Sequence, residues 1–191
     1  MQQADQAPAT GSPDWMAQCD STTVHIDLRG IPSQVPINGN GLGGEGFGRF
    51  HQIQIEVGVA TEATFVDLQR CRRGIEREAF GKPLVQLGAN YDIISECRME
   101  IEQARLLCLK AAWMMDQGDA RAAAPWISQI KVVAPRVALK VVDEAVQIFG
   151  GEDVRQDVPL SAMWTHLRTL RVADGPDAVH RRQVARTELK K

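Results

Sequence analysis

The fold is decided by residues 126–149, which read Trp126-Ile-Ser-Gln-Ile-Lys-Val-Val-Ala-Pro-Arg-Val-Ala-Leu-Lys-Val-Val-Asp-Glu-Ala-Val-Gln-Ile-Phe149. Apolar residues recur there at steps of three and four, which is the spacing of one face of an α-helix. The members of this stripe are Ile127, Ile130, Ala134, Val137, Val141, Ala145 and Ile148. The pattern predicts a helix over residues 120–149, stopped by Gly150 and Gly151, with a kink at Pro135 because proline removes one backbone hydrogen bond.

A second stripe of the same period lies upstream, in residues 89–117. Its members are Ile94, Cys97, Ile101, Ala104, Cys108, Ala111 and Met115. Two long apolar stripes must bury one another, so they predict neighbouring helices of a bundle. Shorter helical patterns follow over residues 160–173 and 176–190. Another helix is expected within residues 50–75, where it is the weakest because Gly58, Thr61 and Thr64 lower its propensity.

The fold class predicted from these patterns is mostly α, an antiparallel four-helix-type bundle over residues 49–191. Residues 1–21 have the composition of a disordered tail, and residues 22–48 that of a short β and loop remnant with a glycine-rich connector. Residues 38–48 match a G-x-G-x-x-G dinucleotide motif by letter. Because no second strand follows to complete a βαβ unit, the connector is the favoured interpretation.

Composition excludes several classes of function. The chain has 22 basic and 24 acidic residues, a net charge of −2, which argues against nucleic-acid or anionic-membrane binding. No apolar run approaches the ~18 residues of a membrane span, and the first twenty residues carry no targeting signal, so we expect a cytoplasmic protein. No Glu is followed three residues later by His, so no di-iron site is expected and the metal prediction is none.

The cysteines predict a reducing compartment. The four of them, Cys19, Cys71, Cys97 and Cys108, form no C-x-x-C pair, and two lie on the apolar stripe of residues 89–117. Buried reduced thiols are therefore favoured over disulfides or zinc ligands.

Three further motifs each have a purely structural interpretation. Residues 77–84, Arg-Glu-Ala-Phe-Gly-Lys-Pro-Leu, can end a helix and turn into the next element. Residues 147–151, Gln-Ile-Phe-Gly-Gly, can be a helix stop at a left-handed glycine. In residues 168–180, Asp174 can cap the helix that follows Gly175 and Pro176.

Together these three stretches resemble the C-terminal helical domain of the acyl-CoA dehydrogenases, in the subgroup with an Ala-Asp-Gly-Pro-Asp segment at residues 173–177. The resemblance covers only that domain, and on this reading the family's N-terminal helical domain and middle β-domain are expected to come from elsewhere. It implies an FAD-dependent oxidoreductase of fatty acid metabolism that desaturates acyl-CoA thioesters between the α and β carbons. Asp174 is then the base that takes the α-proton. From their positions, Arg168 and Arg171 are expected to orient its turn or to pair with Glu152 or Asp153, rather than to take part in the chemistry.

The resemblance also implies a cofactor site that crosses a subunit boundary. Its FAD contacts in this chain are Arg77, Phe80, Gly81, Gln147, Gly150 and Gly151. A planar guanidinium suits a diphosphate because it can pair with two oxygens at once. The implied partners are an acyl-CoA substrate, further copies in a homodimer or homotetramer, and a partner chain that supplies the missing domains. The alternative is a non-catalytic helical bundle, a fragment or oligomerisation module descended from such an enzyme.

Overall fold

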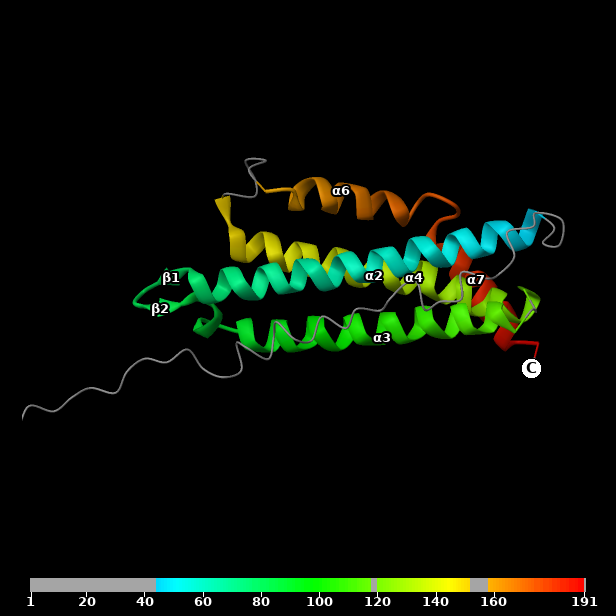
Figure 1. The fold of residues 1–191 in the computed structure, drawn as a ribbon, viewed down its shortest axis with the longest axis horizontal. Coiled ribbons are helices and arrows are strands. Elements are labelled where there is room, and N and C mark those ends of the chain that lie inside the picture. The colour runs from blue at the N-terminus through cyan, green and yellow to red at the C-terminus, as the bar shows by residue number, and fades with distance from the viewer. Residues whose placement is uncertain (1–43, 118–119, 152–157, 191) are drawn as a thin grey trace, which may run out of the picture. The chain divides into compact units, whose positions relative to one another are not determined.

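The structure is a computed structural model that describes residues 44–117, 120–151 and 158–190 (Figure 1). The predictions for residues 1–21 and for most of 22–48 lie outside the described residues. The elements are helices α2 (Gly44–Glu76), α3 (Asn90–Asp116), α4 (Ala120–Phe149), α6 (Leu160–Leu170) and α7 (Asp177–Glu188), strands β1 (Glu78–Ala79) and β2 (Lys82–Pro83), and the 3₁₀ turn η1 (Leu84–Gln86). The described chain is therefore mostly α, as predicted.

Helix α4 is the centre of the bundle. It packs against α2, α3, α6 and α7, and α2 also packs against α3 (Figure 1). The seven residues of its predicted stripe are all buried, and neighbours such as Ala138 and Val142 are buried as well. A helix that is apolar around most of its circumference is stable only when other helices cover it, which explains its central place. Its helix is continuous through Pro125 and Pro135.

Helix α3 supplies the facing half of the core. The middle of its predicted stripe, from Cys97 to Ala111, is buried, and its ends at Ile94 and Met115 are half-buried. Burying a side chain such as Ile101, which is fully inaccessible, contributes about 1.5 to 3 kcal/mol relative to exposure. Cys97 and Cys108 are buried free thiols, as predicted, and burial raises the pKa of the Cys108 thiol to about 12.

The prediction of a weak first helix is wrong. Helix α2 begins at Gly44, inside the segment expected to be a connector, and runs without a break to Glu76. The hydroxyls of Thr61 and Thr64 donate to the carbonyl oxygens four residues earlier, at 2.9 and 3.0 Å. Val59, Ala63 and Val66 are buried in the core. Tertiary burial of this face outweighs the low propensity of its glycine and threonines.

The last two helices are shorter than their sequence patterns. Helix α6 ends at Leu170 rather than at residue 173, and α7 begins at Asp177, one residue after Pro176. The residues between them form a turn, and this turn carries Asp174. The connection is therefore longer than the sequence pattern indicated.

Candidate functional site

A tight hairpin follows α2 and carries Phe80 at its tip. Strands β1 and β2 pair antiparallel, with Ala79 opposite Lys82, and the two residues between them have positive φ, 53° at Phe80 and 75° at Gly81. Two successive positive φ values define the type I′ hairpin turn. The Phe80 side chain is 97% exposed. Sequence reasoning found both residues but missed the strands, which are only two residues long.

Phe80 and Asp174 share an unusual backbone conformation. Among the described residues they are the two that have positive φ without being glycine, each at 53°. Such a conformation costs about 1 to 3 kcal/mol and is concentrated at functional sites. The structure thus places backbone strain at two residues that the sequence motifs had already selected.

Arg77 joins the hairpin to the end of α4. Its Nη1 donates to the carbonyl oxygens of Ile148 and Phe149, both at 3.3 Å. Its own N–H donates to Arg73 O at 3.0 Å, and its carbonyl oxygen accepts from Leu84 N at 2.8 Å. The structure therefore brings together residues 77–84 and 147–151, two motifs far apart in the chain. Arg77 caps the C-terminus of α4, not of the helix that precedes it.

The glycine pair after α4 is a helix stop, as its structural interpretation proposed. Gly150 has φ of 68°, and its N–H donates to Val146 O at 2.8 Å. The guanidinium of Arg73 lies over the Phe149 ring, 5.6 Å from its centroid. Arg73 and Arg77, one turn apart at the end of α2, thus place two positive charges near the C-terminus of α4, where the helix dipole is negative. The cofactor contacts assigned to Gln147, Gly150 and Gly151 stay predictions.

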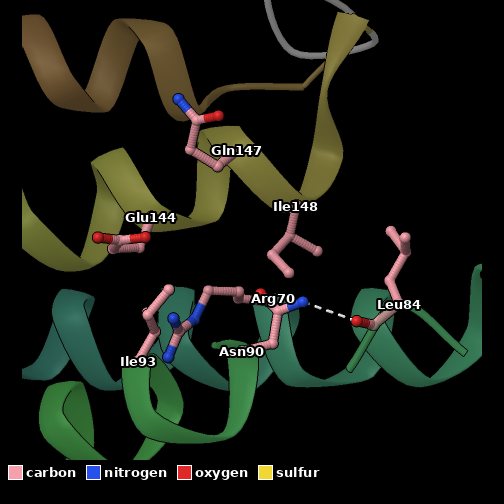
Figure 2. Close-up of a pocket in the computed structure, with 7 residues that line it drawn as sticks. All are labelled: Arg70, Leu84, Asn90, Ile93, Glu144, Gln147 and Ile148. Carbon is pink, nitrogen blue, oxygen red and sulfur yellow. Dashed lines mark hydrogen bonds between the residues drawn. The ribbon is translucent and has the colours of Figure 1, made fainter. Parts of the chain in front are cut away.

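A small cavity of about 320 Å³, lined by both polar and apolar side chains, opens beside Gln147 (Figure 2). It is lined by Arg70, Leu84, Asn90, Ile93, Glu144, Gln147 and Ile148. The Asn90 amide donates to Leu84 O at 2.7 Å, and Arg70 Nη2 donates to Asp67 Oδ1 at 2.6 Å. Arg70 is almost fully buried, and its Nε has no hydrogen-bond partner. Sequence reasoning missed Arg70 and Asn90, because neither belongs to a recognisable motif.

Asp174 lies on the turn between α6 and α7 with its side chain exposed. The cap position of α7 is occupied by Pro176, and no side chain makes a capping hydrogen bond there. The interpretation of Asp174 as an N-cap is therefore wrong. His180 Nε2 lies 3.3 Å from the carbonyl oxygen of Asp174. A Cβ at Gly175, where φ is 103°, would come within 3.1 Å of that ring nitrogen, so the turn requires glycine.

Arg171 orients the turn, as predicted. Its Nε and Nη2 donate to Asp177 Oδ2 at 3.0 and 2.5 Å, and Arg181 Nη2 lies 3.8 Å from the same oxygen. The Asp177 side chain is only 15% exposed, which shields the pair from solvent. This ion pair ties the first residue of the turn, Arg171, to the first residue of α7, Asp177, and so limits the positions that Asp174 can adopt.

A buried charged pair lies within electrostatic reach of Asp174. Lys131 Nζ is 3.6 Å from Glu56 Oε1, and both side chains are inaccessible. Gln52 Nε2 donates to the same Glu56 oxygen at 2.7 Å. Burial raises the pKa of Glu56 to about 7, against the opposing effect of Lys131, and the charge of Asp174 adds a smaller increase. No sequence signal separated this glutamate from those on solvent faces.

The predicted base and the predicted cofactor contacts lie at different ends of the bundle. Glu56 interacts with Asp174, whereas Arg77 follows the end of the same helix, α2. About twenty residues of helix separate Glu56 from Arg77, which corresponds to about 30 Å. The β1–β2 hairpin and the α6–α7 connection accordingly lie toward opposite ends in Figure 1. The structure does not bring Asp174 together with Arg77, Phe80 or Gly150.

None of the helices in the described part of the chain has a stretch long and apolar enough to cross a bilayer. Within residues 44–117, 120–151 and 158–190, no three His, Cys, Asp or Glu side chains are grouped so that they could hold a metal ion.

The fold defines the class of protein, a helical-bundle domain of the acyl-CoA dehydrogenase type. Residues 46–189 match the family model for the acyl-CoA dehydrogenase C-terminal domain. The chain belongs to the acyl-CoA dehydrogenase family.

Several relatives and solved structures are similar to this chain. Acyl-CoA dehydrogenase family member 11 of Gallus gallus is 44% identical over 87% of the chain and 22% of its own length. FadE2 of Mycobacterium tuberculosis, also named as an acyl-CoA dehydrogenase, is 44% identical over 75% of the chain and 35% of its own length.

Among solved structures, a Mycobacterium abscessus protein assigned to the acyl-CoA dehydrogenases superposes with a TM-score of 0.68 at 48% identity, over 75% of this chain and 34% of its own. Butyryl-CoA dehydrogenase of Megasphaera elsdenii superposes with a TM-score of 0.65 at 27% identity, over 76% of this chain and 37% of its own. The chain thus spans between 22% and 37% of the length of these relatives.

Proposed function

We propose that this chain forms the C-terminal helical part of an FAD-dependent acyl-CoA dehydrogenase, which removes hydrogen from the α and β carbons of an acyl-CoA thioester. The proposal rests on one observation: the two residues with a strained backbone conformation both lie in the motifs that resemble the family. Phe80 and Asp174 have φ of 53° without being glycine, and each lies on a motif shared with the family. Both side chains are exposed, so packing against the core does not account for these conformations, which are concentrated at functional sites.

The residues at the hairpin end fit the diphosphate and adenosine part of FAD. The two hydrogen bonds to α4 use Nη1 of Arg77, so its Nε and Nη2 hydrogens can pair with diphosphate oxygens. Phe80 presents an open aromatic face at the hairpin tip. A Cβ at Gly151 would meet nothing within 4 Å, so a ligand can approach the backbone there. Gly81, Gln147 and Gly150 complete the set of proposed contacts.

Asp174 is the proposed base. Its exposed carboxylate stands on a turn fixed by the Arg171–Asp177 ion pair and by His180. In a cleft completed by other domains, one Asp174 oxygen would take the α-proton of the thioester. FAD, when bound, supplies the acceptor for the β-hydride. The buried pair of Lys131 and Glu56 lies within electrostatic reach of this carboxylate, and its net charge becomes more positive when Glu56 takes up a proton.

The distance between the two ends supports an oligomer. A separation of about 30 Å prevents one chain from placing Arg77 and Asp174 at the same reacting atoms. We therefore propose that the two ends serve different flavins, the Arg77 end reaching the flavin of a neighbouring subunit in a homodimer or homotetramer. Exposed apolar side chains on α3, among them Met99, Leu106 and Trp113, offer a surface for such association. A partner chain with the remaining domains would complete each cleft.

The absorption spectrum of the purified chain after incubation with FAD tests the proposal. Retained oxidised flavin, together with acyl-CoA oxidation by an artificial electron acceptor, supports it. A colourless chain that stays inactive, both alone and with the family's other domains added, would establish the non-catalytic bundle instead. The cytoplasmic location also stays a prediction, which cell fractionation would check.

A further inference from the structure

We propose that Gly150 positions Arg77: the missing side chain at residue 150 lets the last carbonyl groups of α4 hold the guanidinium ready for a diphosphate. This inference rests on the proposed function, in which Arg77 meets the diphosphate of FAD. It assigns to Gly150 a role different from direct contact with the cofactor. It also assigns to the α4 C-terminus a role beyond packing.

The first observation is steric. A Cβ built on Gly150 would lie 3.3 Å from Arg77 Nη1. That same nitrogen donates to the carbonyl oxygens of Ile148 and Phe149. The guanidinium therefore borders the space that a side chain at residue 150 would take, and a Cβ there would push it away by a few tenths of an ångström. No other described heavy atom lies within 4 Å of this Cβ position once its sequence neighbours are set aside.

The second observation concerns what can move. The backbone of Arg77 is held by hydrogen bonds to Arg73 O and from Leu84 N, at 3.0 and 2.8 Å. Nη1 is the far end of a flexible side chain, so a methyl group at residue 150 would displace the guanidinium rather than the hairpin. In the wild type, electrostatics also favours the guanidinium at the end of α4, because a cation is stabilised near the negative C-terminal end of a helix.

The expected consequence is a loss of preorganisation. A long side chain that must be ordered when a ligand binds weakens the affinity by about two- to tenfold relative to one already ordered. Gly150→Ala should therefore weaken FAD binding by that factor. In an Arg77→Gln background the same change should have little further effect, because the two residues act through one contact.

The experiment needs a control for backbone strain, because alanine at φ of 68° is strained wherever it occurs. Gly88→Ala provides it: Gly88 has φ of 59°, and a Cβ there would meet nothing within 4 Å. Gly150→Asn is a second variant, since asparagine tolerates positive φ better than alanine while still filling the space beside Arg77. It keeps the test valid if Gly150→Ala fails to fold.

The first measurement needs no ligand. Nitrogen-15 NMR of the Arg77 side chain in the full chain reports how freely the guanidinium rotates. We expect restricted Nη groups in the wild type and in Gly88→Ala, and free rotation in Gly150→Ala and Gly150→Asn. Equal restriction in all four proteins would overturn the positioning role of Gly150, whatever FAD does.

The second measurement is calorimetric titration with FAD of the wild type, Gly88→Ala, Gly150→Ala, Arg77→Gln and the Gly150→Ala/Arg77→Gln double variant. A two- to tenfold loss in Gly150→Ala that disappears in the Arg77→Gln background supports the inference. Independent, additive losses would overturn it. If the wild-type chain binds no FAD, either alone or with the family's other domains added, the proposed function of this chain is overturned, while the NMR measurement still decides whether Gly150 positions Arg77.

Discussion

Nη1 of Arg77 lies 3.3 Å from the carbonyl oxygen of Phe149, although the two residues are 72 positions apart in the chain. This contact joins the end of α2 to the end of α4 and makes one site of two motifs. It also explains why both motifs need glycine nearby, one to turn the hairpin and one to leave room for the guanidinium. Asp174, at the other end of the bundle, belongs to a separate site.

The base assignment predicts that Asp174→Asn removes nearly all acyl-CoA turnover and changes stability little. Asparagine tolerates the same positive φ, and Asp174 makes no cap bond to α7 that could be lost. Turnover with an artificial acceptor and thermal unfolding are the two measurements. Asp143→Asn, on an exposed position of α4, is the control for a lost surface carboxylate. Similar turnover losses in both variants would contradict the assignment.

The Arg171–Asp177 pair predicts that Asp177→Ala destabilises the chain by about 1.5 to 3 kcal/mol, because it removes two charge-assisted hydrogen bonds from a shielded pair. Urea unfolding measures the change. The comparison is Arg98→Ala, whose partner Glu102 and own side chain are both more than 40% exposed, so the loss there should be below about 1 kcal/mol. Equal losses would show that the Arg171–Asp177 pair does not stabilise the turn.

The buried Glu56 predicts a stability that falls as pH rises. Its pKa is raised from 4.5 to about 7, so between these values the folded state keeps a proton that the unfolded state has lost. The contribution is fully present below pH 4.5 and lost through pH 7. A shift of this size corresponds to at most about 3.5 kcal/mol.

The variant Glu56→Gln isolates this effect, because glutamine does not titrate. The free energy of unfolding of the variant, minus that of the wild type, should increase between pH 4.5 and about 7. Above that range the difference should stay constant. The prediction concerns how this difference changes with pH, not its absolute size. Removing the charged partner of Lys131 changes the stability by an amount that hardly depends on pH. Denaturant unfolding at several pH values measures it, and parallel profiles throughout the range would show that Glu56 titrates normally.

The outer face of α3 predicts self-association. Leu106 is 64% exposed and lies on the face of α3 opposite the buried Ile101. Leu106→Glu should shift the chain toward monomer in sedimentation at micromolar concentration without loss of helicity. Ile101→Ala is the contrasting variant, expected to cost about 2 to 5 kcal/mol of stability through a core cavity. A wild-type chain that sediments only as a monomer would rule out the proposed oligomer.

Much of the bundle was predictable because helix periodicity is a local signal. The stripe from Ile127 to Ile148 located α4 to the residue, and the stripe around Ile101 located α3 within one residue at each end. The hairpin was not predictable, because two-residue strands leave no alternating pattern. The length and continuity of α2 were not predictable either. Gly58 and the threonines indicated a low helix propensity, but burial of one face of the helix stabilises it.

The sequence by itself determined where the apolar faces lie, where Gly150 ends a helix, and which motifs resemble a known family. These depend on neighbouring residues and on backbone preferences that act over a few positions. Only the tertiary structure decided that Arg77 caps α4, that Asp174 does not cap α7, and that Glu56 lies buried beside Lys131. Each of these follows from how helices pack or how a turn folds, because packing brings together residues that no local pattern connects.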